Sequence, residues 1–393
     1  MKRLLSIFIF TRNVIPFALG FSASLPGATA SFPTPVDLDS NGVINSFEIQ
    51  TAITAAKGVV FLPANKTYLI DQTLQLTNVN GVSLVGEGPQ TVLPISGNIE
   101  AVVITGGTGC GVRHMKFVGG AGHAQNAIRI SGGNEHFVED VTIENTYRGI
   151  ELVNGIGPVL INVSMSGLTG DYGIKVDAAT GKVDAAQLHG ITGSSSASTI
   201  EWLIFGRVDG VELQGANFST GKRGLRCIGA VGPKYVYTNQ VMIGNCANEG
   251  ILIERGSDLL INATTITQTG GSGFLINSTF TGGAVLTDLN ISDAAGHGVE
   301  ILGGRDIGIV EPLIDATGTA LPPNTGAGIF IATAASHVSI TDGSVKGQHY
   351  GLFYAGTATQ SDSQDVKFKN VFLDCNAVPF TPSNLEGPPA PGP

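Results

Sequence analysis

A short unit recurs along most of the chain, and no other feature restricts the fold as strongly. From about residue 126, Gly or Ala precedes an apolar, a variable and a second apolar residue, as in Gly149-Ile150-Glu151-Leu152 and Gly298-Val299-Glu300-Ile301. Consecutive glycines of these units lie 23 to 30 residues apart, with one gap of 51 that spans two units. A period of this length without helical spacing is typical of a solenoid, in which each coil buries its inner face against its neighbours.

The alternation inside the unit indicates which kind of solenoid forms. The two apolar residues are separated by one residue and therefore point to the same side of a strand, and a second short strand such as Val141-Thr142-Ile143 repeats this pattern. The 55 glycines among 393 residues suit tight turns and are unfavourable inside helices. The sequence therefore predicts an all-β parallel β-helix of about ten coils.

The segment before the repeat is predicted to cap the stack with a short N-terminal helix. Asn45 or Ser46 can N-cap a helix over residues 47–56, Gly58 ends it, and a strand follows over residues 59–62. This opening (residues 41–70) resembles that of the pectate-lyase-like, or pectin-lyase-like, superfamily, and so does the Val-Ser-Leu-Val-Gly-Glu-Gly stretch at residues 82–88. The resemblance implies a right-handed parallel β-helix and, commonly, action on extracellular polysaccharides.

The two ends of the chain are predicted to lie outside the folded domain. Lys2 and Arg3, an apolar run and the small residues 28–30 are typical of a secretory signal peptide. We expect a signal peptide over 1–30, a cap region over 31–75, the β-helix domain over 76–378 and a Pro-rich disordered tail over 379–393. The protein would then be secreted or periplasmic.

Charge and hydropathy restrict the partners. The net charge is −10, and removal of residues 1–30 with their three cations makes it −13, which argues against nucleic-acid binding. Arg12 interrupts the apolar run, so no membrane span is expected. Cys227 and Cys246 could form a disulfide in an oxidising compartment, but the favoured interpretation is two buried free thiols.

Alignment of the coils places charged residues on one outer face. The variable residues and the turn residues before them contribute six cations, namely Arg129, Arg148, Lys175, Lys222, Arg223 and Arg226. Glu151, Asp171 and Asp177 are interleaved with them, and Tyr172 lies alongside. Such a strip in an acidic protein suits an anionic polymer. A ladder of ion pairs between neighbouring strands explains it equally well.

The leading hypothesis is a lyase that cleaves a uronate-containing polysaccharide by β-elimination. Lys175 would be the base, because clustered cations favour its neutral form, and Arg148 with Arg129 would hold the substrate carboxylate. Glu151 would oppose this effect on Lys175, so its expected role is to orient Arg129 or Arg148. Tyr172 would position a sugar ring or donate a proton. The remaining residues of the strip are expected to bind substrate, namely Glu151, Asp171, Asp177, Lys222, Arg223 and Arg226.

Two other functions remain open. One is a glycoside hydrolase that uses paired carboxylates such as Glu151, Asp171 or Asp177, and the other is a carbohydrate-binding or surface solenoid without activity. The Gly296-His297-Gly298 stretch is similar to the GHG of polygalacturonase-type hydrolases, but their paired aspartates are not recognisable here. We therefore interpret His297 as a turn residue.

Two further features suggest a metal and a covered surface. Residues 37–48 fit the pattern of a calcium loop with Asp37, Asp39, Asn41 and Glu48 as ligands. No helix is expected before this loop, and the superfamily opening also explains the segment without Ca²⁺, so calcium is the one cofactor considered. Farther along, the outer face is expected to carry an apolar stripe that a loop, the C-terminal segment or another subunit would cover. Its members are Leu252, Leu275, Phe330 and Phe353.

Overall fold

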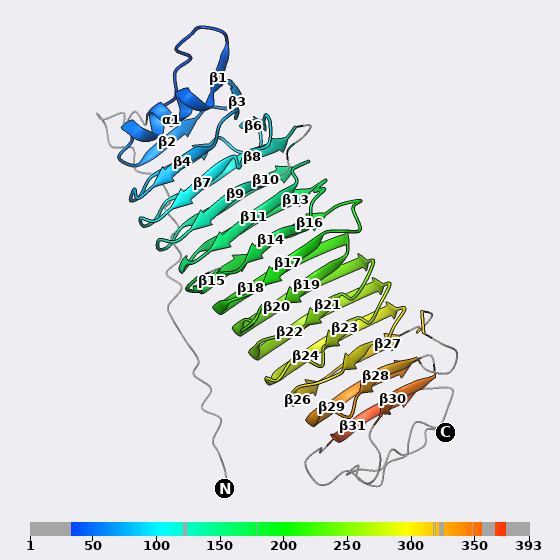
Figure 1. Cartoon of the computed structure of the whole chain (residues 1–393). Coiled ribbons are helices and arrows are strands. Elements are labelled where there is room, and N and C mark those ends of the chain that lie inside the picture. The colour runs from blue at the N-terminus through cyan, green and yellow to red at the C-terminus, as the bar shows by residue number, and fades with distance from the viewer. Residues whose placement is uncertain are drawn as a thin grey trace, which may run out of the picture. The chain divides into compact units, whose positions relative to one another are not determined.

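The computed structural model describes residues 33–120, 123, 125–178, 180–316, 318, 320–321, 326–347, 349–355 and 366–374. The unit that begins at Pro33 is a stack of coils in which strands of successive coils pair in parallel (Figure 1). This is the predicted parallel β-helix. The signal peptide and the Pro-rich tail lie outside the described residues, and both stay predictions.

One side of the stack is a twelve-stranded sheet, here called sheet 1. The twelve strands correspond to about twelve coils rather than the ten that the sequence predicted. In chain order they are β4 (Leu74–Thr77), β7 (Val102–Thr105), β9 (Asn126–Ser131), β11 (Arg148–Val153), β14 (Tyr172–Val176), β17 (Glu201–Phe205), β19 (Arg223–Cys227), β21 (Ile251–Ile253), β23 (Phe274–Ile276), β25 (Val299–Ile301), β28 (Ala327–Ile331) and β30 (Tyr350–Tyr354).

The remaining strands of the stack form sheet 2, which bends around the other sides of the core. Its long strands turn at residues in the left-handed region, for example Gln240 (φ 56°) in β20 and Asp288 (φ 50°) in β24. The strands of sheet 2 are β2 (Val59–Leu62), β5 (Ser83–Gly86), β6 (Val92–Ile95), β8 (Gly111–Gly119), β10 (Phe137–Glu144), β12 (Gly155–Ile156), β13 (Val159–Ser166), β15 (Val183–His189), β16 (Thr192–Ser194), β18 (Val208–Gly221), β20 (Lys234–Cys246), β22 (Ser257–Thr269), β24 (Ala284–Ala294), β26 (Arg305–Val310), β27 (Leu313–Ala316), β29 (Ser336–Gly347) and β31 (Val366–Asp374).

The recurring glycine lies where a coil enters sheet 1, and at Gly149 and Gly173 a side chain would have no room. A Cβ atom on Gly173 would lie 2.8 Å from the Trp202 carbonyl oxygen of the next coil. A Cβ on Gly149 would lie 2.4 Å from the carbonyl oxygen of Gly173 in the same way. The repeat in the sequence therefore marks the close approach of successive coils.

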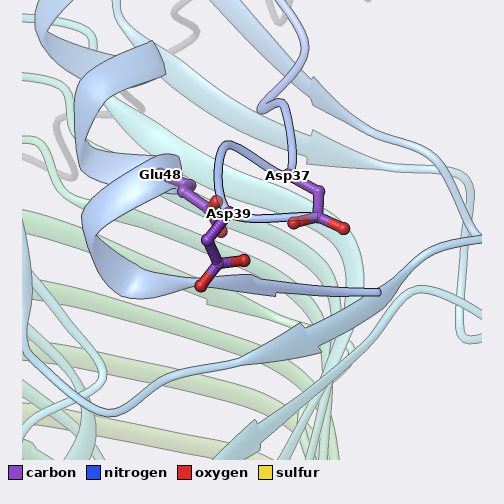
Figure 2. Close-up of side chains that lie close together, drawn as sticks. All are labelled: Asp37, Asp39 and Glu48. Carbon is purple, nitrogen blue, oxygen red and sulfur yellow. The ribbon is translucent and has the colours of Figure 1, made fainter. Parts of the chain in front are cut away.

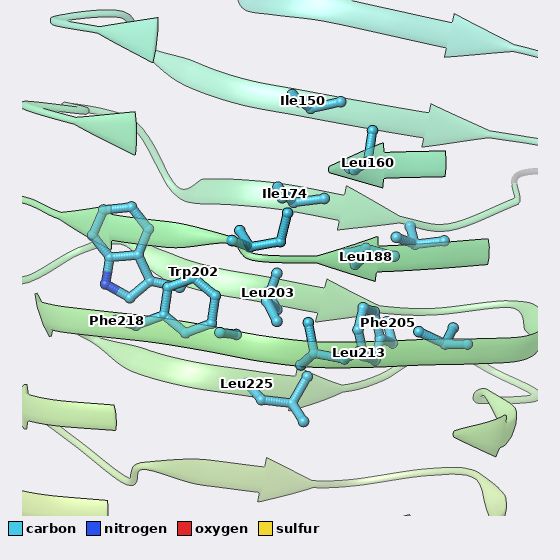
Figure 3. Packing of buried hydrophobic residues seen from close by; sticks show 14 of the residues in the cluster. Ile150, Leu160, Ile174, Leu188, Trp202, Leu203, Phe205, Leu213, Phe218 and Leu225 are labelled. Atoms are coloured by element: carbon cyan, nitrogen blue, oxygen red, sulfur yellow. The ribbon is translucent and has the colours of Figure 1, made fainter. Parts of the chain in front are cut away.

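The apolar residues of each unit form one continuous core (Figure 3). Ile150 pairs with Ile174 and Leu203 with Leu225, so identical positions stack along the sheet. Trp202 occupies the glycine position of its coil and stacks on Phe218, with ring centroids 5.8 Å apart. Each coil thus buries its inner face on its neighbours.

Helix α1 (Ser46–Ala55) precedes the stack, as expected, and strands β1 (Val43–Asn45) and β3 (Thr67–Leu69) form a small parallel pair. Asn45 is the N-cap, and its side chain accepts backbone N–H groups while Glu48 reaches back to the N-cap in a capping box. Ile49 and Ile53 of the helix join the core. The capping helix is therefore confirmed.

Cys227 and Cys246 are buried free cysteines, which confirms the favoured interpretation. Burial raises the pKa of Cys227 and raises that of Cys246 to about 12. Within the described residues, no helix has the length and apolar character needed to span a membrane.

Candidate functional site

The outer face of sheet 1 carries the charged residues in the expected register. The variable residues pair in sequence from Arg129 through Glu151 and Lys175 to Ile204, Arg226 and Leu252. Turn-side residues form a parallel row, in which Arg148 pairs with Asn126, Tyr172 with Glu201, and Glu201 with Arg223. We define the charged strip as the charged residues of these two rows together with Glu100, Asp171, Asp177, Lys222, Glu249 and Glu254.

Lys175 lies between two carboxylates. Its Nζ atom is 3.6 Å from Glu151 Oε1 on the preceding coil and 3.7 Å from Asp177 Oδ2 on its own coil. All three side chains are between one sixth and one third exposed, so a ligand can reach them. The sequence already placed Glu151 beside Lys175, and the structure adds Asp177, so two carboxylates contact this ammonium where clustered cations were expected.

Glu151 belongs to a polar network around the buried Asn126 side chain. Asn126 donates from Nδ2 to Glu100 Oε1 (3.1 Å) and to Glu151 Oε2 (3.3 Å). Arg129 lies between the same two carboxylates, 3.9 Å from Glu100 and 3.4 Å from Glu151. Glu100 was not predicted as a site residue, because it lies one coil before the first recognisable repeat unit.

Tyr172 belongs to this network and is not available for a sugar ring. Its side chain is only 4% exposed, and its hydroxyl donates to Asn126 Oδ1 at 2.7 Å. Burial, and next the charge of Glu151, raise the pKa of Tyr172. The proposed roles in ring stacking and proton donation are therefore corrected to a structural contact.

Arg148 is held by Asp171 and by aromatic rings. Its guanidinium donates to both carboxylate oxygens of Asp171, and this hydrogen bonding raises the pKa of Arg148. The guanidinium carbon also lies 4.9 Å from the ring centroid of Tyr172 and 5.1 Å from that of Tyr147. Arg148 is thus already engaged by residues of this chain.

The second half of the charged strip is organised by Glu201, which sequence reasoning missed. Its carboxylate is within 3.5 Å of Lys222, 2.6 Å of Arg223 and 3.1 Å of Arg226. Arg223 also contacts Glu249, and Arg226 also contacts Glu254. These three cations were expected to bind substrate, but each contacts a carboxylate of the protein.

Beyond Arg226 the same row is apolar except for Glu300. Leu252 is only 4% exposed, whereas Leu275, Phe330 and Phe353 are partly exposed. The Phe330 and Phe353 rings stack with centroids 5.5 Å apart. Three of the four residues thus keep part of their surface exposed, and a cover by a loop, the C-terminal segment or another subunit stays a prediction.

His297, in the Gly-His-Gly stretch, is buried at the start of its coil. Its Nδ1 atom accepts the backbone N–H of Ala327, and its ring stacks on Phe330 with centroids 4.8 Å apart. Burial lowers the pKa of His297. The interpretation of His297 as a structural residue at the coil entry fits these contacts.

The possible calcium loop brings its acidic residues together before α1 (Figure 2). One oxygen each of Asp37, Asp39 and Glu48 lies within 4.8 Å of the others. Asp37 also accepts the N–H groups of Asn41 and Gly42, and the Gly42 bond lowers the pKa of Asp37. Because all these side chains offer oxygen, and carboxylate oxygens can accept a further partner, the set fits Ca²⁺.

Comparisons with known proteins support the fold. Neither a family profile nor a curated protein sequence matches the chain. Among solved structures, the tailspike protein gp49 from Pseudomonas phage LKA1 is 11% identical with a TM-score of 0.56, over 83% of this chain and 73% of that one.

Two carbohydrate-active structures are similar to the same degree. Endo-xylogalacturonan hydrolase from Aspergillus tubingensis is 11% identical with a TM-score of 0.54, over 89% of this chain and 100% of that one. The catalytic domain of a GH87 α-1,3-glucanase, in complex with nigerose, is 13% identical with a TM-score of 0.54, over 93% and 71% of the two chains. The chain therefore has the right-handed parallel β-helix fold that these structures share.

Proposed function

We propose that the protein acts on a polysaccharide at the charged strip of sheet 1, and that it hydrolyses glycosidic bonds with Glu151 and Asp177. The observation that carries this proposal is the pair of carboxylates that contact one Lys175 ammonium on an accessible face. Glycosidases commonly use two carboxyl groups on either side of the bond that is broken.

The distances are compatible with such a pair. Both carboxylates contact the same Nζ atom, at 3.6 and 3.7 Å, so the two contacting oxygens are no more than 7.3 Å apart, the sum of these distances. Retaining enzymes place the carboxyl groups about 5 to 5.5 Å apart and inverting enzymes about 6.5 to 9.5 Å apart. Lys175 would hold the two groups in position and contact the sugar.

The names of similar structures agree with a polysaccharide as substrate. One is a hydrolase of xylogalacturonan and another is an α-1,3-glucanase bound to nigerose. At such a low sequence identity, the structural similarity supports the fold alone. The assignment of hydrolysis to this chain therefore depends on the carboxylate pair.

β-Elimination with Lys175 as the base is the alternative that the sequence suggested. It requires a lysine that gives up its proton and cations that can hold a uronate carboxylate. Lys175 instead contacts two carboxylates, and Arg129 and Arg148 contact Glu151 and Asp171. The contacts of this face therefore argue against Lys175 as the base of an elimination.

Product analysis of the purified protein on a panel of polysaccharides tests the proposal. A hydrolase generates new reducing ends without an unsaturated, ultraviolet-absorbing sugar, whereas a lyase generates both. We expect reducing ends alone from at least one polymer. Ultraviolet-absorbing products would favour elimination, and binding without any product would favour a non-catalytic solenoid.

We also propose that residues 1–30 direct export and are removed. The basic start, the apolar run and the small residues at 28–30 support this. Mass spectrometry of the protein from its natural host should give a chain that begins near Ser31. An intact Met1 on the mature protein would contradict it.

A further inference from the structure

All six cations of the charged strip have carboxylate partners within 4.0 Å. The pairs are Arg129 with Glu100 and Glu151, Arg148 with Asp171, Lys175 with Glu151 and Asp177, Lys222 with Glu201, Arg223 with Glu201 and Glu249, and Arg226 with Glu201 and Glu254. The strip thus holds one carboxylate more than it holds cations. It is a balanced network rather than a basic surface.

An anionic sugar would meet this network at a disadvantage. A uronate carboxylate that reached Lys175 would lie beside Glu151 and Asp177, both less than 4 Å from the ammonium. A uronate carboxylate that reached Arg129 would displace the guanidinium from Glu100 or Glu151, and the displaced glutamate would lose its cation partner. Repulsion between like charges therefore opposes binding of a polyuronate.

A neutral sugar fits the same groups. Each sugar hydroxyl can donate to a carboxylate and accept from a guanidinium or an ammonium at the same time. Arg129, Glu151 and Lys175 form such an alternating series across three neighbouring coils. A row of hydroxyl groups can bind there without separating an existing ion pair.

The part of sheet 1 beyond the charged strip provides a second, independent observation on the charge of the ligand. In the described residues, the outward row from β21 to β30 contains no Lys or Arg; it consists of Leu252, Leu275, Glu300, Phe330 and Phe353. A charged polymer that followed the sheet in this direction would meet one carboxylate and apolar side chains. A neutral polymer would meet partly exposed aromatic and aliphatic groups that suit the C–H faces of sugars.

From these observations we infer that the polysaccharide bound at the charged strip is neutral. The inference rests on the proposed function, because it concerns the substrate of the same face. It replaces the anionic polymer that the sequence suggested, since the cations counted there are paired with carboxylates in the fold.

Affinity electrophoresis of the wild-type protein tests it directly. The gels would contain α-1,3-glucan, β-glucan, xylan or galactan as neutral polymers, and polygalacturonate or alginate as anionic ones. We expect retardation by at least one neutral polymer, equal at ~20 mM and ~500 mM salt, because no net charge is exchanged. We expect none by polygalacturonate or alginate.

Two double variants test whether the pairing of the cations with carboxylates is what prevents binding of an anionic polymer. Asp171→Asn with Glu254→Gln frees Arg148 and one side of Arg226 on the strip. Asp184→Asn with Asp209→Asn frees Lys182 away from sheet 1 and changes the net charge equally. The first variant should be retarded by polygalacturonate at low salt with at least tenfold higher affinity than the wild type. The second should behave like the wild type.

The outcomes separate this inference from the proposed function. Wild-type protein that binds or hydrolyses a polyuronate in preference to the neutral polymers would overturn the inference, although hydrolysis would support the function. Binding of a neutral polymer without hydrolysis would support the inference and contradict the function. No binding to any polymer, or equal polygalacturonate binding by the two variants, would overturn the inference.

Discussion

Glu201 is the residue on which the second half of the charged strip depends. It is 4% exposed and contacts Lys222, Arg223 and Arg226. Two of these contacts come from β19, the next strand of sheet 1, so the carboxylate joins two coils. Its removal would leave cations together without their shared counter-charge.

We predict that Glu201→Ala lowers the free energy of unfolding by about 3 to 5 kcal/mol, the cost of breaking a buried ion pair from one side. Denaturant unfolding followed by circular dichroism would measure it. Glu212→Ala is the control, because Glu212 is more exposed and its one ion pair within the described part of the chain is with His189 in sheet 2. A loss no larger than that of the control would contradict the buried role of Glu201.

Three buried histidines make stability depend on pH. Nδ1 of His123, His136 and His297 each accepts a backbone N–H, so the neutral ring is the form that fits. Burial lowers the pKa of all three. Because the unfolded chain then binds protons more readily, stability is complete above about pH 6.5 and is lost as the pH falls below it.

We predict that the melting temperature falls between pH 7 and pH 5, and that His136→Gln makes this fall smaller. His337→Gln is the control, since His337 is half exposed and pairs with Asp306 on the surface. Thermal unfolding at several pH values measures both. An equal pH dependence in the two variants would show that His136 is not responsible.

At the scale of single elements, the acidic loop that leads into α1 suggests that calcium stabilises the protein. Asp37, Asp39 and Glu48 gather oxygens there, and Glu48 also caps the helix. We expect Ca²⁺ to raise the melting temperature by several degrees, and Asp39→Asn to abolish the rise without changing the melting temperature in EDTA. Differential scanning fluorimetry with Ca²⁺, Mg²⁺ and EDTA would measure it. Equal melting curves in Ca²⁺ and EDTA would rule out a structural site.

The elements themselves were largely predictable, because one repeat determines them. The spacing of Gly149 and Gly173 gives the coil length, and the residue between the apolar positions gives the register of Glu151 against Lys175. Glu201 was not predicted as a site residue, because Trp202 follows it in place of the glycine that opens other units. The core accepts this exception, since the Trp202 ring lies on Phe218.

Exposure was harder to predict than direction. Tyr172 and Leu252 point outward from their strands as expected, yet both are buried. The Tyr172 hydroxyl contacts Asn126, and the Tyr172 ring contacts the guanidinium of Arg148, each on another coil. Such contacts depend on the lengths of side chains in neighbouring coils. The repeat period in the sequence predicts the register of the strands, but it does not predict these side-chain contacts.

The whole molecule depends on one core that continues from coil to coil. Ile251 is 1% exposed and pairs between Leu225 and Phe274. Ile251→Asp should lower the free energy of unfolding by more than about 3 kcal/mol, because it buries an unpaired charge. Met242→Asp, at a position 54% exposed, is the control. Equal unfolding curves of the two variants would contradict the β-helix core.

The central claim is that sheet 1 carries the reaction through Glu151 and Asp177. The most direct measurement compares the release of reducing ends by Glu151→Gln, Asp177→Asn and Glu144→Gln on the polymer that the wild type degrades. Glu144 is the matched control, because it is a partly exposed carboxylate that pairs with Lys116 on sheet 2. We predict at least a 100-fold loss of kcat for the first two variants, both of which should stay folded at the assay temperature, and wild-type activity for the third. Wild-type activity in Glu151→Gln and Asp177→Asn would show that the charged strip is only a ladder of ion pairs.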